Sequence, residues 1–220
     1  MEYAFDNEEQ RLKAEPGLQG VCPTCGSLVV ARCGSINAWH WAHKDRLDCD
    51  PWSESETEWH LEWKRFVIPE KVEVVIKPHR ADIVGMRGIV VELQHSPISA
   101  DEIMERERFY KKMVWVIDAA SFAHNFILKG KGNRKTFRWK WPKKSWAVAT
   151  CPLFLDFGND KLFEIEKLYP SSPGRLVETF GADGSRLSLH WESRRPCAGV
   201  GHILPKDNFL LRFLRDRLRG

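Results

Sequence analysis

The sequence predicts an α/β fold in which a helix, three strands, a second helix and a fourth strand follow one another. The first helix is indicated by an apolar stripe over residues 54–67 that stops before Pro69. Short apolar runs typical of strands fill most of residues 71–94. A charged helical segment then starts at Ser99 and leads into the buried strand 113–117. The three meandering strands would pair antiparallel, and the second helix would let the fourth strand join in parallel.

Polar residues accompany the apolar stripe of the first predicted helix. The stripe itself consists of Trp59, Trp63, Phe66 and Val67. Ser53 or Ser55 is the expected N-cap. Glu56, His60 and Lys64 follow at intervals of four residues beside the stripe, so an acid and a histidine could reach a site beneath the helix. Taken alone, this spacing favours a structural role for both residues. His60 would pack half-buried against the core, and Glu56 would be its i,i+4 partner.

The second and third predicted strands carry polar side chains within apolar runs. Asp82 lies in one run, while Glu92 and Gln94 share one face of the other because side chains alternate along a strand. Two glycines between the runs would allow a tight hairpin that brings Asp82 beside Glu92. Burying carboxylates is costly, and a divalent cation such as Mg²⁺ would compensate their charge. Alternatively, these acids lie at solvated strand ends or pair with Arg80 or Lys64.

Residues 21–50 predict a small zinc-binding module. They are poor in aliphatic residues, and the pair Cys22 and Cys25 has the spacing of a zinc knuckle. His40 and His43, in the sequence HWAH, supply two further candidate ligands. Cys33 and Cys49 are rival ligands for either histidine. A region with so little core would draw folding energy from the metal, although reduced cysteines beside surface histidines are the simpler alternative.

A basic, tryptophan-containing segment between residues 129 and 146 predicts contact with nucleic acid. The segment holds no acid. Lysine and arginine neutralise phosphates, and indole rings can stack on unpaired bases. The candidate contacts are Arg138, Trp139, Lys140, Trp141, Lys143 and Lys144. The alternative is a solvated strand edge, where lysine discourages pairing with other strands.

The remaining segments give weaker predictions. Residues 1–20 look like a weakly structured lead-in, and residues 170–205, which are rich in Pro, Gly and Ser, predict loops. Two strands, 137–141 and 146–157, are expected to form a hairpin around Pro142, and residues 162–168 form another element. Residues 209–219 predict a short basic amphipathic helix. On the charged second helix, Arg106, Glu107, Arg108 and Tyr110 face either the acids or water, and water is the default for such a helix.

Composition places the chain among globular intracellular proteins. It has 220 residues and a net charge of +4, and its charged and aliphatic content argues against disorder. The acidic start lacks the apolar core of a signal peptide, and no apolar run approaches transmembrane length. We therefore expect a cytoplasmic protein without membrane contact. The expected domains are a lead-in and zinc module over 1–50, a core over 51–120 and a basic extension over 121–220.

These segments together resemble the CoiA-like competence proteins. The resemblance rests on CPTCG, HWAH, ESETEWHLEWK, RADI, VELQ and SPISADEIMERERFY, which occur in the family's order over roughly residues 20–120. That family resembles the PD-(D/E)xK nuclease superfamily, whose core has the same order of helix, three strands, helix and strand. The resemblance implies a Mg²⁺- or Mn²⁺-dependent deoxyribonuclease preceded by a structural zinc module.

The resemblance also implies roles for individual residues. Asp82 matches the motif aspartate, Glu92 the second acid, and Glu56 and His60 the acid and histidine of the first helix. The two acids and the Leu93 carbonyl would hold the metal. Lys64 or Arg108 would contact the phosphate. Gln94 stands where the motif usually has lysine, and a glutamine can orient water or a phosphate oxygen but cannot carry positive charge.

The resulting function hypothesis is hydrolysis of DNA phosphodiester bonds in DNA uptake (competence), recombination or antiphage defence. Its alternative is a non-catalytic DNA-binding protein that keeps the nuclease fold and the zinc module. A third hypothesis, a redox or zinc-storage protein, is disfavoured by the basic segment. Whether the DNA is single- or double-stranded stays open, as does a protein partner or a homo-oligomer.

Overall fold

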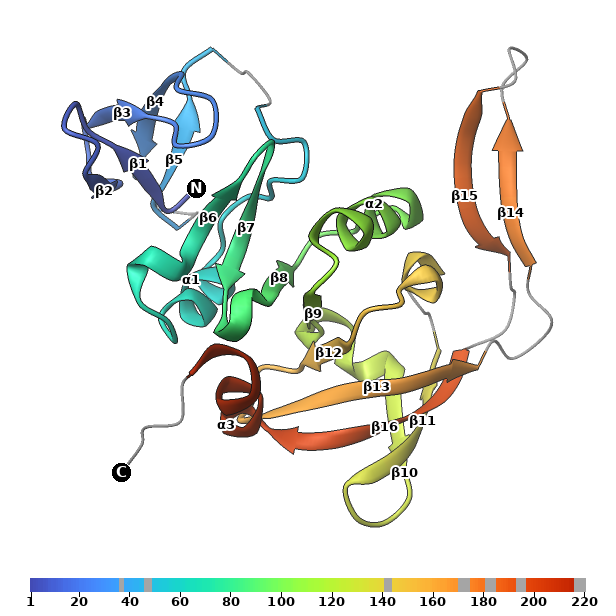
Figure 1. The fold of residues 1–220 in the computed structure, drawn as a ribbon. Coiled ribbons are helices and arrows are strands. Elements are labelled where there is room, and N and C mark those ends of the chain that lie inside the picture. The colour runs from blue at the N-terminus through green and yellow to red at the C-terminus, as the bar shows by residue number, and fades with distance from the viewer. Residues whose placement is uncertain are drawn as a thin grey trace. The chain divides into compact units, whose positions relative to one another are not determined.

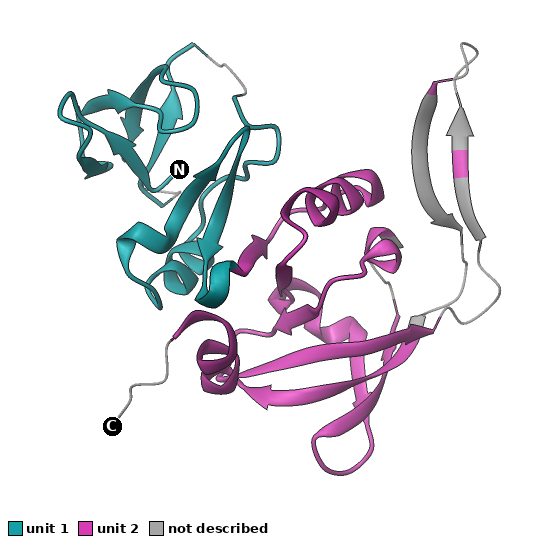
Figure 2. Cartoon of the chain, viewed as in Figure 1, with its two compact units in different colours: residues 1–88 teal, residues 89–220 magenta. Residues whose placement is uncertain are grey.

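The protein is described by a computed structural model, which covers residues 1–35, 38–45, 49–140, 144–169, 175–180, 185–192 and 197–215. The chain forms two compact units, Met1–Gly88 and Ile89–Gly220, which Figure 2 colours separately. Within the described residues, no helix is long and apolar enough to span a membrane.

The first unit begins with a five-stranded antiparallel sheet of order β2-β1-β3-β4-β5. Its strands are Tyr3–Phe5, Arg11–Lys13, Gln19–Val21, Leu28–Arg32 and His40–His43. The expectation of a weakly structured lead-in over residues 1–20 was wrong. Met1, Ala4 and Ala14 pack with Val29 and Trp41 in the core of this small sheet. The first residues are ordered because they supply apolar surface that the cysteine-rich segment lacks.

Helix α1 and a strand hairpin complete the first unit (Figure 1). Helix α1 spans Glu58–Lys64 and is shorter than predicted, since Thr57, rather than Ser53 or Ser55, caps it in a reciprocal capping box with His60. After a 3₁₀ turn at Pro69–Lys71, strands β6 (Val72–Ile76) and β7 (His79–Val84) pair antiparallel. Another 3₁₀ turn, Met86–Gly88, ends the unit.

The second unit contains a mixed sheet whose strands follow the order β10-β11-β16-β13-β12-β9-β8. Strand β8 is Val90–Gln94, helix α2 is Ala100–Tyr110 and strand β9 is Met113–Asp118. Helix α2 begins one residue after the predicted start at Ser99, and Ser99 caps it by accepting a hydrogen bond from the Glu102 backbone N–H. Strands β8 and β9 run parallel, which confirms the crossover role expected of the second helix. The sequence of elements from α1 to β9 therefore matches the predicted order.

The C-terminal half contains more strands than predicted. Its strands are β10 (Phe126–Lys129), β11 (Arg134–Trp139), β12 (Leu153–Asp156), β13 (Lys161–Tyr169), β14 (Arg175–Phe180), β15 (Arg186–Glu192) and β16 (Cys197–Pro205), with 3₁₀ turns at Ala120–Asn125 and Lys144–Val148. The hairpin expected around Pro142 was wrong. Strand β11 pairs with β10 and β16, whereas β12 joins β9 in parallel and β13 in antiparallel orientation.

The loops expected over residues 170–205 were also wrong for the three strands described there, β14, β15 and β16, whereas residues 170–174, 181–184 and 193–196 lie outside the described residues. In β16, glycine serves packing. A Cβ atom on Gly199 would come within 2.1 Å of the Lys167 carbonyl oxygen and 2.6 Å of the Phe137 ring. Gly201 has equally close contacts with Glu164 and Phe163. Glycine here admits aromatic rings against the strand instead of marking a turn. The predicted basic helix is a short α3 (Lys206–Phe209) continued by a π-helical turn, Leu210–Leu214.

Candidate functional site

A cluster of three thiols and one imidazole forms at one end of the small N-terminal sheet. Cys22 directly follows β3, and its carbonyl accepts a hydrogen bond from the Gly26 N–H at 2.9 Å, which closes the knuckle turn that carries Cys25. Gly26 has a φ of +74°, a conformation that favours glycine. His43 ends β5, and Cys49 follows the sheet. The ligand atoms of these four residues all lie within 4.8 Å of one another.

The spacing of the ligand atoms fits a tetrahedral metal site. The Sγ atoms of Cys22 and Cys49 are 3.7 Å apart, and Cys25 Sγ lies 3.3 Å from His43 Nε2. Tetrahedral zinc with its usual bond lengths places two sulfurs about 3.8 Å apart, and a sulfur and a nitrogen about 3.6 Å apart. Three cysteines and one histidine are a common ligand set of structural zinc sites, so this cluster can hold zinc.

The fourth candidate ligand differs from the sequence prediction. His40 stands outside the cluster, where its Nδ1 contacts the Ala38 carbonyl oxygen at 2.8 Å, and Cys49 occupies the fourth position. The physical reason is that HWAH forms strand β5. Residues three apart on a strand point to opposite faces, whereas on a helix they would share one. Cys33, the other rival ligand, packs against the core instead.

Two thiols of the cluster have strongly shifted pKa values. Burial raises the pKa of Cys25, but hydrogen bonds from the side chain and backbone of Ser27 and from His43 outweigh it and lower the pKa to about 6. Burial, together with the negative charge of Cys22, raises the pKa of Cys49 to about 12. A metal ion in the cluster would relieve this mutual repulsion, because coordinated thiols are deprotonated.

A buried ion cluster lies beside α1 in the same unit. Lys64 Nζ donates to both carboxylate oxygens of Glu56 at 2.8 and 2.9 Å and to Glu73 Oε1 at 3.1 Å. Glu73 also accepts hydrogen bonds from the backbone N–H groups of Glu2 and Tyr3 at 2.8 and 3.3 Å. The three charged side chains are only 3 to 4% exposed. Lys64 is thus enclosed by carboxylates and not placed to contact a phosphate, contrary to the sequence prediction.

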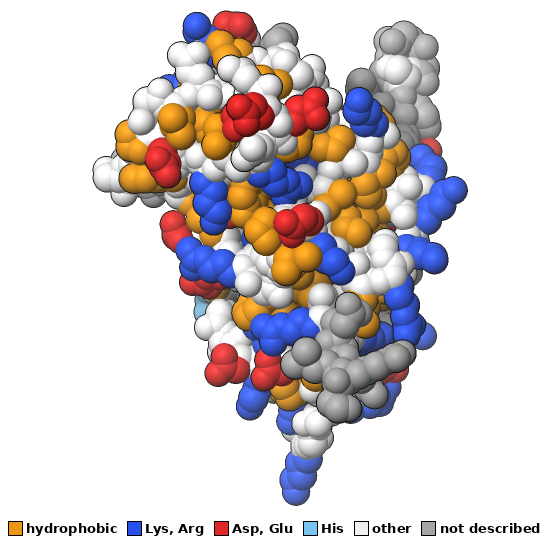
Figure 3. Space-filling model, turned by 60° about the vertical axis from the view of Figure 1, so that its left-hand side comes forward, with side chains coloured by type: hydrophobic (Ala, Val, Ile, Leu, Met, Phe, Trp, Pro, Cys, Tyr) orange, Lys and Arg blue, Asp and Glu red, His pale blue; other side chains and the backbone are white. Residues whose placement is uncertain are grey.

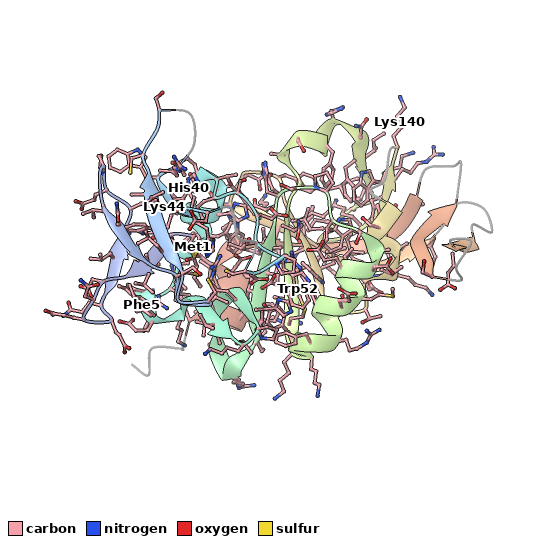
Figure 4. All side chains as sticks on the ribbon, turned by 90° about the horizontal axis from the view of Figure 1, so that it is seen from above. Met1, Phe5, His40, Lys44, Trp52 and Lys140 are labelled. Carbon is pink, nitrogen blue, oxygen red and sulfur yellow. The ribbon has the colours of Figure 1, made fainter. Side chains whose placement is uncertain are left out.

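The first-helix residues occupy positions that differ from the prediction. Glu56 precedes the N-cap, so its inward direction does not come from helical phase. His60 is buried, with Nδ1 2.8 Å from the Thr57 hydroxyl and Nε2 3.7 Å from Glu54 Oε2. Glu54 and Glu56 line a cavity of about 520 Å³. Met1 and His40, both labelled in Figure 4, line the same cavity.

Asp82 is half-buried on β7, between the fully buried Ala81 and Ile83. Its negative charge raises the pKa of two buried cations, Lys64 and Arg80, although burial of each cation opposes this. These two cations therefore compensate the charge of Asp82, which agrees with the alternative from the sequence that this acid pairs with Arg80 or Lys64.

Glu92 and Gln94 lie on β8 in the second unit and are each 2% exposed. Arg106, from α2, donates through Nη1 to Glu92 Oε2 at 2.7 Å and also pairs with Glu102. Arg106 and Glu107 are buried, so the default expectation of water contact was wrong for both, and Arg106 faces the acid Glu92, the alternative that the sequence left open. Since Asp82 and Glu92 belong to different units, their pairing at one metal stays a prediction.

Of the residues predicted to contact nucleic acid, one is buried in the core and others are exposed. Trp139 is 1% exposed and stacks on Phe122 at a centroid distance of 4.9 Å, so it belongs to the core. Arg108, Arg138 and Lys140 are exposed, and Lys140 projects outward from its unit in Figure 4. Trp141 and Lys143 lie outside the described residues, as does the side chain of Lys144.

Sequence reasoning missed Glu73. It stands alone within the apolar strand β6, and this signal is the same one that singled out Asp82. Arg106 was named only among four residues that face either the acids or water, because its helix is charged on most positions and only the packing of α2 against β8 selects it.

Comparisons with known proteins agree with the family resemblance. The model of the competence protein CoiA N-terminal domain matches residues 6–51, and that of the competence protein CoiA nuclease-like domain matches residues 57–183. The competence protein CoiA of Bacillus subtilis (strain 168) is 27% identical over 104 residues, which cover 41% of this chain and 28% of that relative. No solved structure matches the chain. Because the nuclease-like model alone spans more than half of the sequence, the chain belongs to the family of the competence protein CoiA.

Proposed function

We propose that the chain is a metal-dependent nuclease with a PD-(D/E)xK core that hydrolyses DNA phosphodiester bonds in DNA uptake, recombination or defence. The observation that carries the proposal is the buried carboxylate of Glu92, which shares β8 with Gln94 inside the region matched by the nuclease-like family model. A buried acid is costly to maintain, and such acids cluster at functional sites.

The donor atoms proposed for the metal are chemically suited to it. Asp82, Glu92 and the Leu93 carbonyl offer oxygen atoms only, which Mg²⁺ and Mn²⁺ prefer. The Glu92 carboxylate already accepts a hydrogen bond from the Arg106 guanidinium, so its surroundings stabilise a positive charge. When bound, the ion would activate a water molecule and stabilise charge on the scissile phosphate.

The chain's own residues would orient the reactants. Gln94 would direct a water molecule or a phosphate oxygen through its side-chain amide. We assign water positioning to His60 and a structural role to Glu56, since Lys64 binds both oxygens of that carboxylate.

Contact with the DNA backbone is assigned to exposed cations. Arg138 and Lys140 on and after β11, and Arg108 on α2, are accessible for phosphates. On the face shown in Figure 3, basic side chains alternate with acidic ones, in keeping with the modest net charge of +4. Because only a few phosphates would be contacted, the affinity for DNA should fall with rising salt by a correspondingly small factor.

The zinc module would stabilise the first unit.

A non-catalytic DNA-binding protein is the second candidate. It is favoured by Gln94, which cannot supply the positive charge of the usual lysine, and by the ion pair in which Arg106 already compensates Glu92.

Incubation of zinc-loaded protein with labelled single-stranded and duplex DNA separates the two candidates. Mg²⁺, Mn²⁺ or EDTA would be added, and the variants Asp82→Ala and Glu92→Ala would be compared with Glu105→Ala, which changes an exposed acid on α2. A nuclease loses cleavage in the first two variants, with DNA binding retained. Retained binding without any strand scission by the parent protein would establish the binding module instead.

A further inference from the structure

A second cavity of the first unit lies apart from the zinc-ligand cluster. It has a volume of about 580 Å³, within the range of small-molecule sites. Its walls come from β2 and the residue after it, from the segment between β4 and β5, and from α1 and its C-cap. The residues that matter here are Glu2, Lys13, Trp39, Glu58 and Arg65.

We propose that this cavity binds an unpaired nucleobase of a DNA strand, stacked on the indole ring of Trp39. The proposal rests on the DNA substrate assigned above and deepens it, because it favours single-stranded over fully paired DNA.

Trp39 supplies the stacking surface. It is 50% exposed, whereas its neighbours Ala38 and Trp41 are buried at 7% and 2%. A tryptophan side chain has only two rotatable bonds, so stacking a base on the exposed part of its ring costs little side-chain entropy. Bases stack on such rings regardless of their identity, because every base has a π face.

Cations at the cavity would hold the phosphates that flank the base. Arg65 is exposed at the C-cap of α1, and Lys13 is 67% exposed, with its ammonium 3.2 Å from Glu2 Oε1. Because Lys13 is 67% exposed, its ammonium can turn toward a phosphate, although Glu2, which is 12% exposed, would then lose part of its counter-charge.

Carboxylates in the cavity add a base preference. Glu58 is exposed on the first turn of α1, so its carboxylate is accessible to a base in the cavity. Carboxylates accept hydrogen bonds from the amino group of cytosine, which thymine lacks. The cavity should therefore favour cytosine over thymine.

The test measures binding of fluorescent oligo-dC and oligo-dT of about 12 nucleotides, a length that covers one such site, to the zinc-loaded full chain in the absence of Mg²⁺. Trp39→Ala should weaken oligo-dC binding about 5- to 150-fold, which is the effect of losing one stacked base. Trp39→Phe should keep most of the affinity, and Tyr169→Ala, which removes another exposed aromatic, should change nothing. Unchanged zinc content and circular dichroism show that each variant is folded.

Equal oligo-dC binding by the parent protein and Trp39→Ala would overturn the cavity assignment while leaving the nuclease proposal intact. Trp39-dependent binding without cleavage in Mg²⁺ would support the cavity and refute the nuclease. A parent protein that binds neither oligonucleotide would overturn the cavity assignment, whereas the nuclease proposal would still be decided by cleavage of duplex DNA in Mg²⁺.

Discussion

Replacement of Lys64 by methionine tests whether the buried ion cluster maintains the first unit. Methionine keeps most of the side-chain volume but removes the ammonium group, which makes three contacts of 2.8 to 3.1 Å with Glu56 and Glu73. Two carboxylates that are 3 to 4% exposed would then face each other without their main counter-charge. The Met1 amine, 3.9 Å from Glu56, compensates only part of it.

The expected loss is about 3 to 5 kcal/mol, the usual cost of breaking a buried ion pair from one side. A domain is stable by only about 5 to 15 kcal/mol, so the first unit would lose a large share of its stability. For a unit of this size, a loss of 3 kcal/mol lowers Tm by at least about 12 °C.

The assay is urea unfolding at constant free zinc, followed by circular dichroism. Lys13→Met is the matched control, because Lys13 is 67% exposed and its ion pair with Glu2 should contribute less than about 1 kcal/mol. Adding Glu56→Gln and Glu73→Gln to Lys64→Met should recover part of the loss, since the unpaired charges disappear. The reasoning is refuted if Lys64→Met destabilises no more than Lys13→Met.

Three further predictions concern the zinc ligands, acid stability and a buried carboxylate of the second unit. Cys49→Ala should lose bound zinc while His40→Ala retains it, as measured by metal analysis after gel filtration; the reverse result would restore the histidine pair. Burial raises the pKa of Glu73, but neighbouring cations outweigh it and hold the pKa well below 4.5. Its stabilisation is therefore present above pH 4.5 and is lost as pH falls below 4.5 toward the lowered pKa. The unfolding free energy of Glu73→Gln should thus fall less steeply with acidification below pH 4.5 than that of the parent, and an equal fall in both proteins would contradict this. Four donor groups make hydrogen bonds of 3.1 Å or less to the Glu107 carboxylate, including one of 2.6 Å from the Thr150 hydroxyl. Glu107→Ala should therefore cost at least about 3 kcal/mol in urea unfolding, against less than about 0.5 kcal/mol for the exposed Glu105→Ala.

Local patterns predicted the elements between α1 and β9 well. Helix α2 begins within one residue of the predicted start at Ser99, which caps it, and strand 113–117 lies within one residue of β9. These features depend on short-range chemistry, namely a side-chain oxygen that accepts a backbone N–H and an apolar run long enough for one strand.

Predictions that depended on a choice between alternative local structures were less successful. HWAH was assigned two ligands, although a strand directs only one of its histidines toward Cys22. Gly199 and Gly201 suggested a loop, although both lie in a strand and admit aromatic rings. Trp139 suggested a stacking platform, although it packs in the core.

The sequence by itself determined the family, the order of the central elements and the set of residues from which ligands are drawn. The tertiary structure decided which of those side chains converge, placing Cys49 rather than His40 in the metal cluster and Arg106 on Glu92. The physical reason is that residue type and spacing follow from the chain, whereas convergence depends on strand register and on packing between elements distant in sequence.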